Sequence, residues 1–229
     1  MNLNLKTQQQ INFSDIVANN AMNRERGFSG INSYEKELRF SLGDFFEREL
    51  QTQSCVTWLD LCCGKGYALQ EAASKFADLA VCGIDLVGDF VHVAGGKFIV
   101  GSLPEALPES TFDLITCVHG LHYVVDKLGF IHDAAKLLTP NGIFLGNLDH
   151  RNIKSSSGKT LRGIVKLLST SPSKYSGNVL RISQPIEKFP YELIGGDDQA
   201  GPNYTHQPVI DSYYAPLEKI NKTRQHLEK

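Results

Sequence analysis

The sequence predicts an α/β fold in which one mostly parallel sheet carries helices on both faces. An apolar run at 56–61 passes through a short glycine loop into a helical pattern at 67–76, which is the order of elements that opens a βαβ unit. A second apolar strand follows at 79–86, and strand and helix patterns continue to alternate through the central part of the chain. Because crossovers between parallel strands are right-handed, this alternation predicts a sheet covered on both sides.

Charge and hydropathy indicate which kinds of partner and which cell compartment to expect for this protein. The chain has 23 basic and 25 acidic side chains, so its formal charge of −2 gives no general attraction to nucleic acid or to an anionic membrane. It does not open with a basic-then-apolar leader, and no apolar run approaches the ~20 residues that span a bilayer. We expect a cytoplasmic protein with no nucleic-acid or membrane partner. The sequence leaves the oligomeric state open.

The five cysteines are expected to be reduced thiols. They form no Cys-x-x-Cys pair and are odd in number, and most fall within predicted buried strands, where thiols act as small apolar side chains. Metal ligands at the spacing of a zinc site are not found, so we expect no metal centre. The cysteines are Cys55, Cys62, Cys63, Cys82 and Cys117.

Two amino-terminal segments precede the first strand. Residues 1–30 are rich in Asn and Gln and carry apolar side chains at positions 11, 13, 16 and 17, which fits a loose arm or a short amphipathic helix. The apolar spacing from Glu35 to Leu50 predicts a helix, with Ser33 or Asn32 as its N-cap.

The glycine loop after the first strand is a candidate binding site. Gly64 and Gly66 have no Cβ and tolerate positive φ, so the backbone can turn sharply and let a ligand lie against it. Asp85 ends the second strand roughly 20 residues later, the spacing at which a carboxylate reaches a ribose diol. Plainer interpretations stay open, because Gly-x-Gly also forms ordinary tight turns and a strand-end Asp also caps helices.

These features resemble the class I S-adenosylmethionine-dependent methyltransferases, especially those that act on small molecules. Residues 98–104 resemble the family's third strand and adenine loop, 111–124 its fourth strand and following helix, and 138–147 its fifth strand. The resemblance implies a Rossmann-like, doubly wound, mostly parallel seven-stranded sheet, with an antiparallel carboxy-terminal hairpin and an amino-terminal helical lid.

Length and composition favour one elaborated domain. A chain of 229 residues with 41% hydrophobic content can bury one sizeable core. We expect an amino-terminal arm at 1–30 and a single methyltransferase domain at 31–229. Within that domain we expect the core at 55–149 and a substrate-side elaboration at 150–215.

The resemblance also implies a cofactor, S-adenosyl-L-methionine, which needs no metal because its sulfonium already activates the methyl group. Asp85 is the expected ribose ligand. Tyr34 is a candidate aromatic contact from the lid, although it could equally pack its helix onto the sheet. The residues expected to bind the cofactor are Tyr34, Asp60, Cys62, Gly64, Gly66, Asp85, Leu86, Ser102, Leu103 and Cys117.

The chain departs from the family pattern at two places. Ser102 stands where an acidic residue commonly accepts a hydrogen bond from the adenine amino group, and its hydroxyl can accept the same bond without a charge. Leu103 would add apolar contact. The segment from Gly88 to Gly96 is too rich in glycine for the full helix that usually follows the second strand, so we expect this crossover to be shortened.

Two histidines at the end of the fourth strand are candidates for catalysis. His119 and His122 stand three residues apart, so one side of a helical turn can carry both. Either imidazole could remove a proton from an O–H or N–H acceptor. In the alternative interpretation both only pack and hydrogen-bond beside the cofactor. His119 is slightly favoured because it is nearer the strand end, and Asp149 and His150 after the fifth strand are the next candidates.

The carboxy-terminal third has weaker patterns. A helix is expected within 159–169, and the Ser/Pro/Gly-rich stretch at 169–178 is expected to be a loop. Strand-like runs at 189–194 and 209–214 are expected to complete the sheet as its antiparallel pair.

The polar turn between these runs, 195–204, carries two adjacent carboxylates. Asp197 and Asp198 could bind a cationic substrate or a metal, but a solvated turn held by Asx bonds is the favoured interpretation.

The expected activity is methyl transfer to an oxygen, nitrogen or carbon nucleophile of a small molecule. The alternatives are a non-catalytic cofactor-binding or partner-binding module, a methyltransferase acting on protein or nucleic acid, and an NAD-binding oxidoreductase. Leu69 stands at the third glycine of the dinucleotide fingerprint, which argues against NAD. No NPPY-like motif or basic, aromatic-interleaved stretch supports nucleic acid. The acceptor is not specified by the sequence.

Overall fold

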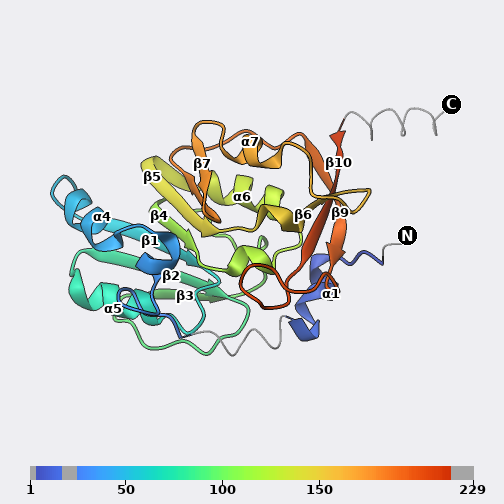
Figure 1. The fold of residues 1–229 in the computed structure, drawn as a ribbon. Coiled ribbons are helices and arrows are strands. Elements are labelled where there is room, and N and C mark those ends of the chain that lie inside the picture. Colours follow the sequence, from blue (N-terminus) through green and yellow to red (C-terminus); the bar gives the residue numbers. More distant parts are fainter. Residues whose placement is uncertain (1–3, 17–24, 218–229) are drawn as a thin grey trace.

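The computed structural model describes residues 4–16 and 25–217, and within them the strands form two sheets (Figure 1). The strands of the larger sheet are β1 (Val56–Leu61), β2 (Leu79–Asp85), β3 (Lys97–Val100), β4 (Phe112–Cys117), β5 (Leu138–Asn147), β7 (Ser173–Ser176) and β8 (Val179–Ile182). Those of the smaller sheet are β6 (Ile153–Ser155), β9 (Tyr191–Asp197) and β10 (Asp211–Pro216).

The larger sheet has seven strands in the order β3-β2-β1-β4-β5-β8-β7. Strands β1 to β5 pair in parallel, β8 runs antiparallel to β5, and β7 runs antiparallel to β8. This is a Rossmann-like, mostly parallel sheet with one antiparallel hairpin, and the predicted fold class is confirmed.

The helices pack on both faces of the larger sheet. On one face Trp58 of β1 contacts an aromatic cluster, with ring centroids 5.5 Å from Phe46 and 6.2 Å from Phe28. On the other face, apolar side chains of α6 and α7 join a second buried cluster. The α-helices are α1 (Gln8–Asn12), α3 (Tyr34–Leu38), α4 (Leu42–Glu49), α5 (Tyr67–Lys75), α6 (Lys127–Ala135) and α7 (Ile164–Leu168).

The register of the parallel strands brings their carboxyl ends to one edge. Asp60 of β1 is paired with Gly83 on β2 and with Thr116 on β4. Cys117, at the end of β4, is paired with Gly146 on β5. The residues that follow β1, β2 and β4 therefore meet at the edge where open α/β sheets bind ligands.

The antiparallel hairpin of the larger sheet is not where the sequence placed it. It is formed by β7 and β8, joined at Gly177 and Asn178 with φ of 55° and 63°. Two adjacent residues with positive φ form the tight turn that suits a hairpin. The prediction of a loop at 169–178 is wrong for β7, because this four-residue strand starts and ends with serine and shows no apolar alternation.

The two runs expected to complete the sheet pair with each other in a separate sheet. β9 and β10 are antiparallel as predicted, but β10 takes β6 as its parallel neighbour, giving the order β6-β10-β9. Figure 1 shows this smaller sheet beside α1, at one side of the larger sheet. Pairing between distant segments decides this arrangement, and the local pattern does not specify it.

The helix predicted from Glu35 to Leu50 is two helices. Ser33 caps α3, as expected, by accepting a hydrogen bond from the Lys36 N–H. Arg39 then adopts a left-handed conformation with φ of 50°, which ends α3. Ser41 supplies a second N-cap for α4, so the apolar spacing continues across a break in the helix.

Two other local expectations agree with the structure in part. No helix is described between β2 and β3, in line with the glycine content of 88–96. The helix expected within 159–169 is shorter and begins at Ile164, because Gly163 adopts a positive φ of 78° just before it.

The amino-terminal arm packs against the smaller sheet. Lys6 exchanges two backbone hydrogen bonds with Gly196 of β9. Ile11 of α1 is completely buried against Val125 and Ile210, whereas Phe13 is 92% exposed. The predicted apolar position at 17 lies outside the described residues. Among the described helices, none is both long and apolar enough to cross a membrane.

Candidate functional site

A cavity of about 410 Å³ lies at the carboxyl edge of the larger sheet, a volume typical of small-molecule sites. The arm, α3, the ends of β1, β2 and β4, and the segment after β9 contribute to its wall. It brings together nine of the residues predicted from the sequence: Tyr34, Cys62, Gly64, Asp85, Leu86, Ser102, Leu103, His119 and His122. Asp60, Gly66 and Cys117 do not line it.

The Asp85 carboxylate organises the glycine loop. Its Oδ2 accepts a hydrogen bond from the Gly64 N–H at 2.9 Å, and its Oδ1 accepts one from the Val87 N–H at 3.0 Å. Gly64 has a φ of 62°, in the region that favours glycine. Because no helix follows β2 in the described chain, Asp85 caps a turn. The carboxylate is thus held in a fixed orientation on the cavity wall, which suits a contact with two ribose hydroxyls.

Asp60 lies beneath the cavity and not on its wall. It is completely buried, and its two oxygens accept hydrogen bonds from Tyr34 Oη at 2.7 Å and from Thr116 Oγ1 at 2.6 Å. Thr116 in turn accepts from Trp58 Nε1 at 2.8 Å. Burial raises the pKa of Asp60 to about 7. Asp60 therefore acts on the cavity through Tyr34, which it anchors.

Gly66 and Cys117 also support the wall from behind. Gly66 precedes α5 with a φ of 84°, and a Cβ there would lie 2.7 Å from the Phe98 ring. Cys117 is buried, and a hydrogen bond with its thiol, followed by burial, raises the pKa of the Cys62 thiol. A Cβ on Gly120 would lie 2.6 Å from Cys62 Sγ, so the floor of the cavity is closely packed. None of the five cysteines, all of which lie in the described chain, forms a disulfide.

The side of the cavity that includes Ser102 is closed by the arm. Asn12 Nδ2 donates a hydrogen bond to Ser102 Oγ at 2.8 Å, and Gln8 Nε2 donates to Asn12 Oδ1 at 2.9 Å. Gln8 Oε1 accepts from the Val125 N–H at 2.7 Å, which ties α1 to the segment before α6. Ser102 thus already accepts one hydrogen bond, and the polar groups available to a ligand here include those of Gln8 and Asn12.

Helix α3 brings two side chains to the cavity. Tyr34 is 4% exposed, packs edge-on against Trp58 with ring centroids 6.1 Å apart, and donates its hydroxyl to Asp60. Burial raises the pKa of Tyr34 well above its usual value, so it stays a neutral donor. Both interpretations of Tyr34 hold in the structure, since it packs the helix onto the sheet and also lines the cavity.

Glu37, one turn after Tyr34, faces His119. Its Oε2 lies 3.0 Å from His119 Nε2, and Arg26 Nε lies 3.6 Å from its Oε1. The neighbouring His119 is the largest cause that lowers the pKa of Glu37, although the 3.0 Å contact is a close approach of the two groups and not an aligned hydrogen bond. His119 has a φ of 60° and immediately precedes a short 3₁₀ helix, Gly120–His122. The strand end thus turns sharply and presents the imidazole to the carboxylate.

His122 differs from His119 in its surroundings. It is completely buried, whereas the His119 side chain is 14% exposed; in both histidines the ring nitrogens make no aligned hydrogen bond within the described residues. Burial, with smaller contributions from His119 and Lys127, lowers the pKa of His122 to about 3. A proton taken up by His122 would therefore be held poorly at neutral pH. Of the two predicted candidates, His119 has the counter-ion that a general base needs.

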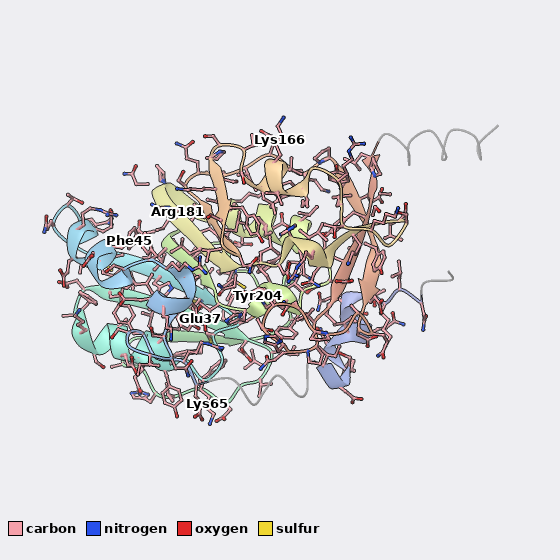
Figure 2. The ribbon with its side chains drawn as sticks, viewed as in Figure 1. Glu37, Phe45, Lys65, Lys166, Arg181 and Tyr204 are labelled. Atoms are coloured by element: carbon pink, nitrogen blue, oxygen red, sulfur yellow. The ribbon has the colours of Figure 1, made fainter. Side chains whose placement is uncertain are left out.

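The segment after β9 reaches back into the cavity. Tyr204 packs edge-on against His122 with ring centroids 5.5 Å apart, and its centroid lies 6.5 Å from that of His119. Thr205 and Gln207 also line the wall. Figure 2 shows Tyr204 and Glu37 near one another, close to the middle of the molecule in this view.

The two carboxylates of this segment have local partners. Asp197 Oδ1 accepts from the Gln199 N–H, an Asx-type bond, and Asp198 forms an ion pair with Lys6 at 2.6 Å. Neither lines the cavity. In the part of the chain that the structure describes, no group of three or more His, Cys, Asp or Glu side chains is placed to hold a metal ion.

Asp149 and His150 also lie outside the cavity. Asp149 is held by a two-point contact with Arg151, and His150 contacts Tyr175 Oη. Both side chains therefore have local structural partners, and neither lies beside the cofactor cavity.

Sequence reasoning missed Glu37, Tyr204, Gln8 and Asn12. A signal existed for Glu37, because a residue three positions after Tyr34 on a helix lies on the same face. The other three are brought in by pairing of the arm and of β9 with distant parts of the chain, which no local pattern records.

The fold and this site define a class I methyltransferase. The family model described as "Methyltransferase domain" matches residues 24–164, and the chain belongs to this family. It is therefore an S-adenosylmethionine-dependent methyltransferase, and the predictions of family, enzyme class and cofactor are confirmed.

Several known proteins are similar to it. The ubiquinone biosynthesis O-methyltransferase of Vibrio cholerae is 35% identical over 169 residues, 68% of this chain and 66% of that protein. The one of Vibrio parahaemolyticus is 29% identical over 184 residues, 74% of this chain and 72% of that protein. Among solved structures, the plantazolicin methyltransferase BpumL in complex with SAH aligns with a TM-score of 0.44 and 19% identity, covering 63% of this chain and 58% of that one.

Proposed function

We propose that the protein transfers a methyl group to a hydroxyl oxygen of a small molecule, with His119 as the general base. The observation that carries the proposal is the contact between His119 Nε2 and Glu37 Oε2 at 3.0 Å, on the wall of a cavity of small-molecule size. The O-methyltransferases to which the chain is similar support oxygen over nitrogen or carbon.

Held by Asp85 and the Gly64 loop, the cofactor would supply an electrophilic methyl group to the acceptor oxygen, and the products would be a methyl ether and S-adenosylhomocysteine. His119 takes the hydroxyl proton in the same step and becomes an imidazolium. The Glu37 carboxylate stabilises that cation, since opposite charges at this distance favour the charged form. His122 stays neutral and shapes the wall beside it.

The chain's other contributions are binding and alignment. We assign Asp85 to the ribose hydroxyls, and Leu86 and Leu103 to apolar contact with the adenine. Gly64 gives the close approach of the backbone, and Ser102 shares the adenine side with Asn12. Asp60 acts through Tyr34. A cavity built from buried walls aligns the acceptor and excludes water, which raises the rate by proximity and orientation.

We also propose the division of the chain into an arm at 1–30 and one catalytic domain at 31–229, with its core at 55–149. The segment 150–215 forms the acceptor side, because Tyr204, Thr205 and Gln207 reach the cavity from it. Because Ile11 is buried and Asn12 donates a hydrogen bond to Ser102, we include the arm in the wall of the cofactor cavity.

The function is tested by incubating the purified protein with methyl-labelled cofactor and a cell lysate separated into small molecules and macromolecules. Label in the small-molecule fraction, bound through an alkali-stable ether, supports the proposal. Label only in protein or nucleic acid contradicts it. If neither fraction is labelled although calorimetry shows S-adenosylhomocysteine binding, the protein is a non-catalytic module.

A further inference from the structure

A second, polar cleft of about 450 Å³ lies beside the cofactor cavity, and Tyr204 lines both. The cleft lies between the start of the smaller sheet and the segment that follows β9. Asn152 and Asn203 face it from these two sides, together with the charged residues Asp149, Arg151, Lys154 and Asp211.

The charges of the cleft are already matched to one another. Arg151 Nη2 lies 2.7 Å from Asp149 Oδ2, and Arg151 Nε lies 3.0 Å from Asp149 Oδ1. Lys154 Nζ lies 3.3 Å from Asp211 Oδ2. A charged ligand would have to compete with one of these pairs, whereas an uncharged polar ligand would leave both intact.

Three buried polar atoms on this wall have no partner within the described residues. They are Asn152 Oδ1, Asn203 Nδ2 and Tyr204 Oη. Asn152 is only 7% exposed, and its Nδ2 donates to Asp211 Oδ1 at 2.6 Å, which fixes its free oxygen as the acceptor. Asn203 Oδ1 accepts from Thr205 at two points, which fixes its free Nδ2 as the donor. Leaving buried polar groups unsatisfied is costly.

We propose that the polar cleft binds an uncharged, hydroxyl-bearing end of the acceptor, while the reacting hydroxyl of the same molecule lies at His119. A hydroxyl both donates and accepts, so it can satisfy the Asn152 oxygen and the Asn203 amide together. Tyr204 stands between the two ends of the acceptor. Its ring packs against His122, and its hydroxyl is the third unpartnered group.

This inference rests on the proposed function, because it assigns two ends to one acceptor. Tyr204, Asn152 and Asn203 are specificity residues in it and not catalytic ones. The ring contacts of Tyr204 with the two histidines favour a planar acceptor, since aromatic rings pack well against such a wall.

The charge preference is tested with three phenols that differ only in their tails: 4-hydroxyphenethyl alcohol, 4-hydroxyphenylacetate and tyramine. Each is titrated by NMR into the protein saturated with S-adenosylhomocysteine. We expect the neutral alcohol to bind at least about tenfold more tightly than the acid or the amine. Equal affinities, tighter binding of a charged probe, or no binding of any of the three overturns the proposal.

Two variants identify the site of binding. Tyr204→Phe removes only the free hydroxyl, and Asn203→Asp keeps the oxygen that accepts from Thr205 while replacing the free donor. We expect each variant to weaken binding of the neutral alcohol at least about fivefold. The affinity for S-adenosylhomocysteine should stay within about twofold of the wild-type value. The matched controls are Tyr213→Phe and Asn178→Asp, which lie outside both cavities. Unchanged binding in both test variants overturns the assignment.

Transfer of label to the alcohol separates this inference from the proposed function. If the alcohol binds through Tyr204 and Asn203 but receives no methyl group, the assignment of the cleft stands and O-methylation of this class of acceptor is contradicted. If both variants methylate the alcohol as well as the wild type does, O-methylation is supported and the role of the cleft in binding the acceptor is contradicted.

Discussion

The Glu37 carboxylate lies 3.0 Å from His119 Nε2 and joins helix α3 to the carboxyl end of β4. The same helix reaches a second strand end through Tyr34, whose hydroxyl donates to Asp60 at 2.7 Å. The backbone carbonyl of Glu37 also accepts from Asn147 Nδ2 at the end of β5. One short helix is thus fixed to three parallel strands, and it holds a counter-ion beside the candidate base.

Replacing Glu37 with Gln should lower the methyl-transfer rate about tenfold, because the imidazolium formed in the reaction loses its counter-ion. The rate is measured in single-turnover assays, and S-adenosylhomocysteine affinity should stay within about twofold of the wild type, which a general structural defect would not allow. Glu35→Gln on the same helix is the control, since its side chain is bonded to the Gly43 N–H away from His119. A transfer rate within about twofold of the wild type in Glu37→Gln would contradict the pairing.

The two histidines should differ in their kinetic effect. His119→Gln should reduce the transfer rate by about 10²–10⁴ with little change in cofactor affinity, as expected for loss of a general base. His122→Gln should cost less, because burial lowers the pKa of His122 to about 3 and it is a poor proton acceptor at neutral pH. The measurement is single-turnover transfer, with S-adenosylhomocysteine binding recorded for each variant. A larger loss in His122→Gln would reverse the assignment.

Asp85→Ala should weaken S-adenosylhomocysteine binding about 10- to 100-fold, since hydrogen bonds to a charged group contribute about 1.5–3 kcal/mol. The variant also loses the bond that holds Gly64, so its fold should be checked by circular dichroism. Asp89→Ala, whose carboxylate is largely exposed on the following segment, is the matched control. Affinity within twofold of the wild type in Asp85→Ala would end the ribose assignment.

Asp60 should make the free energy of unfolding depend on pH. Its folded pKa is raised to about 7 from 3.8, so between these values the folded state binds more proton than the unfolded state. Stability from this group is therefore lost as pH rises from about 4 to about 7. Asp60→Asn removes the titration, so the variant should gain stability relative to the wild type between pH 5 and pH 8.

Urea unfolding of both proteins at these two pH values gives the required difference, in which other titrating groups cancel. Asp133→Asn, an exposed position on α6, should show no such change. A stability difference between wild type and Asp60→Asn that is the same at both pH values would show that Asp60 does not titrate in this range.

The sequence by itself determined the parallel sheet and the position of its cofactor edge. The apolar runs of β1, β2 and β4, the positive φ of Gly64 and the strand-end position of Asp85 are local properties, and each follows from residue type and short-range spacing. Eight of the nine predicted site residues in the cavity, all except Tyr34, meet there because parallel strands bring their carboxyl ends to one edge.

Only the tertiary structure decided which side chains from outside the parallel strands face the cofactor edge of the sheet. Glu37 reaches His119 because α3 is bonded to the ends of β1 and β5, and Tyr204 reaches His122 because β9 pairs with β10 in a separate sheet. Asp60 was expected from the sequence to contact the cofactor, and in the structure it is buried beneath the cavity and accepts a hydrogen bond from Tyr34. These arrangements depend on pairing and burial between distant segments, whose energies are set by the folded neighbours and not by the local pattern of the chain.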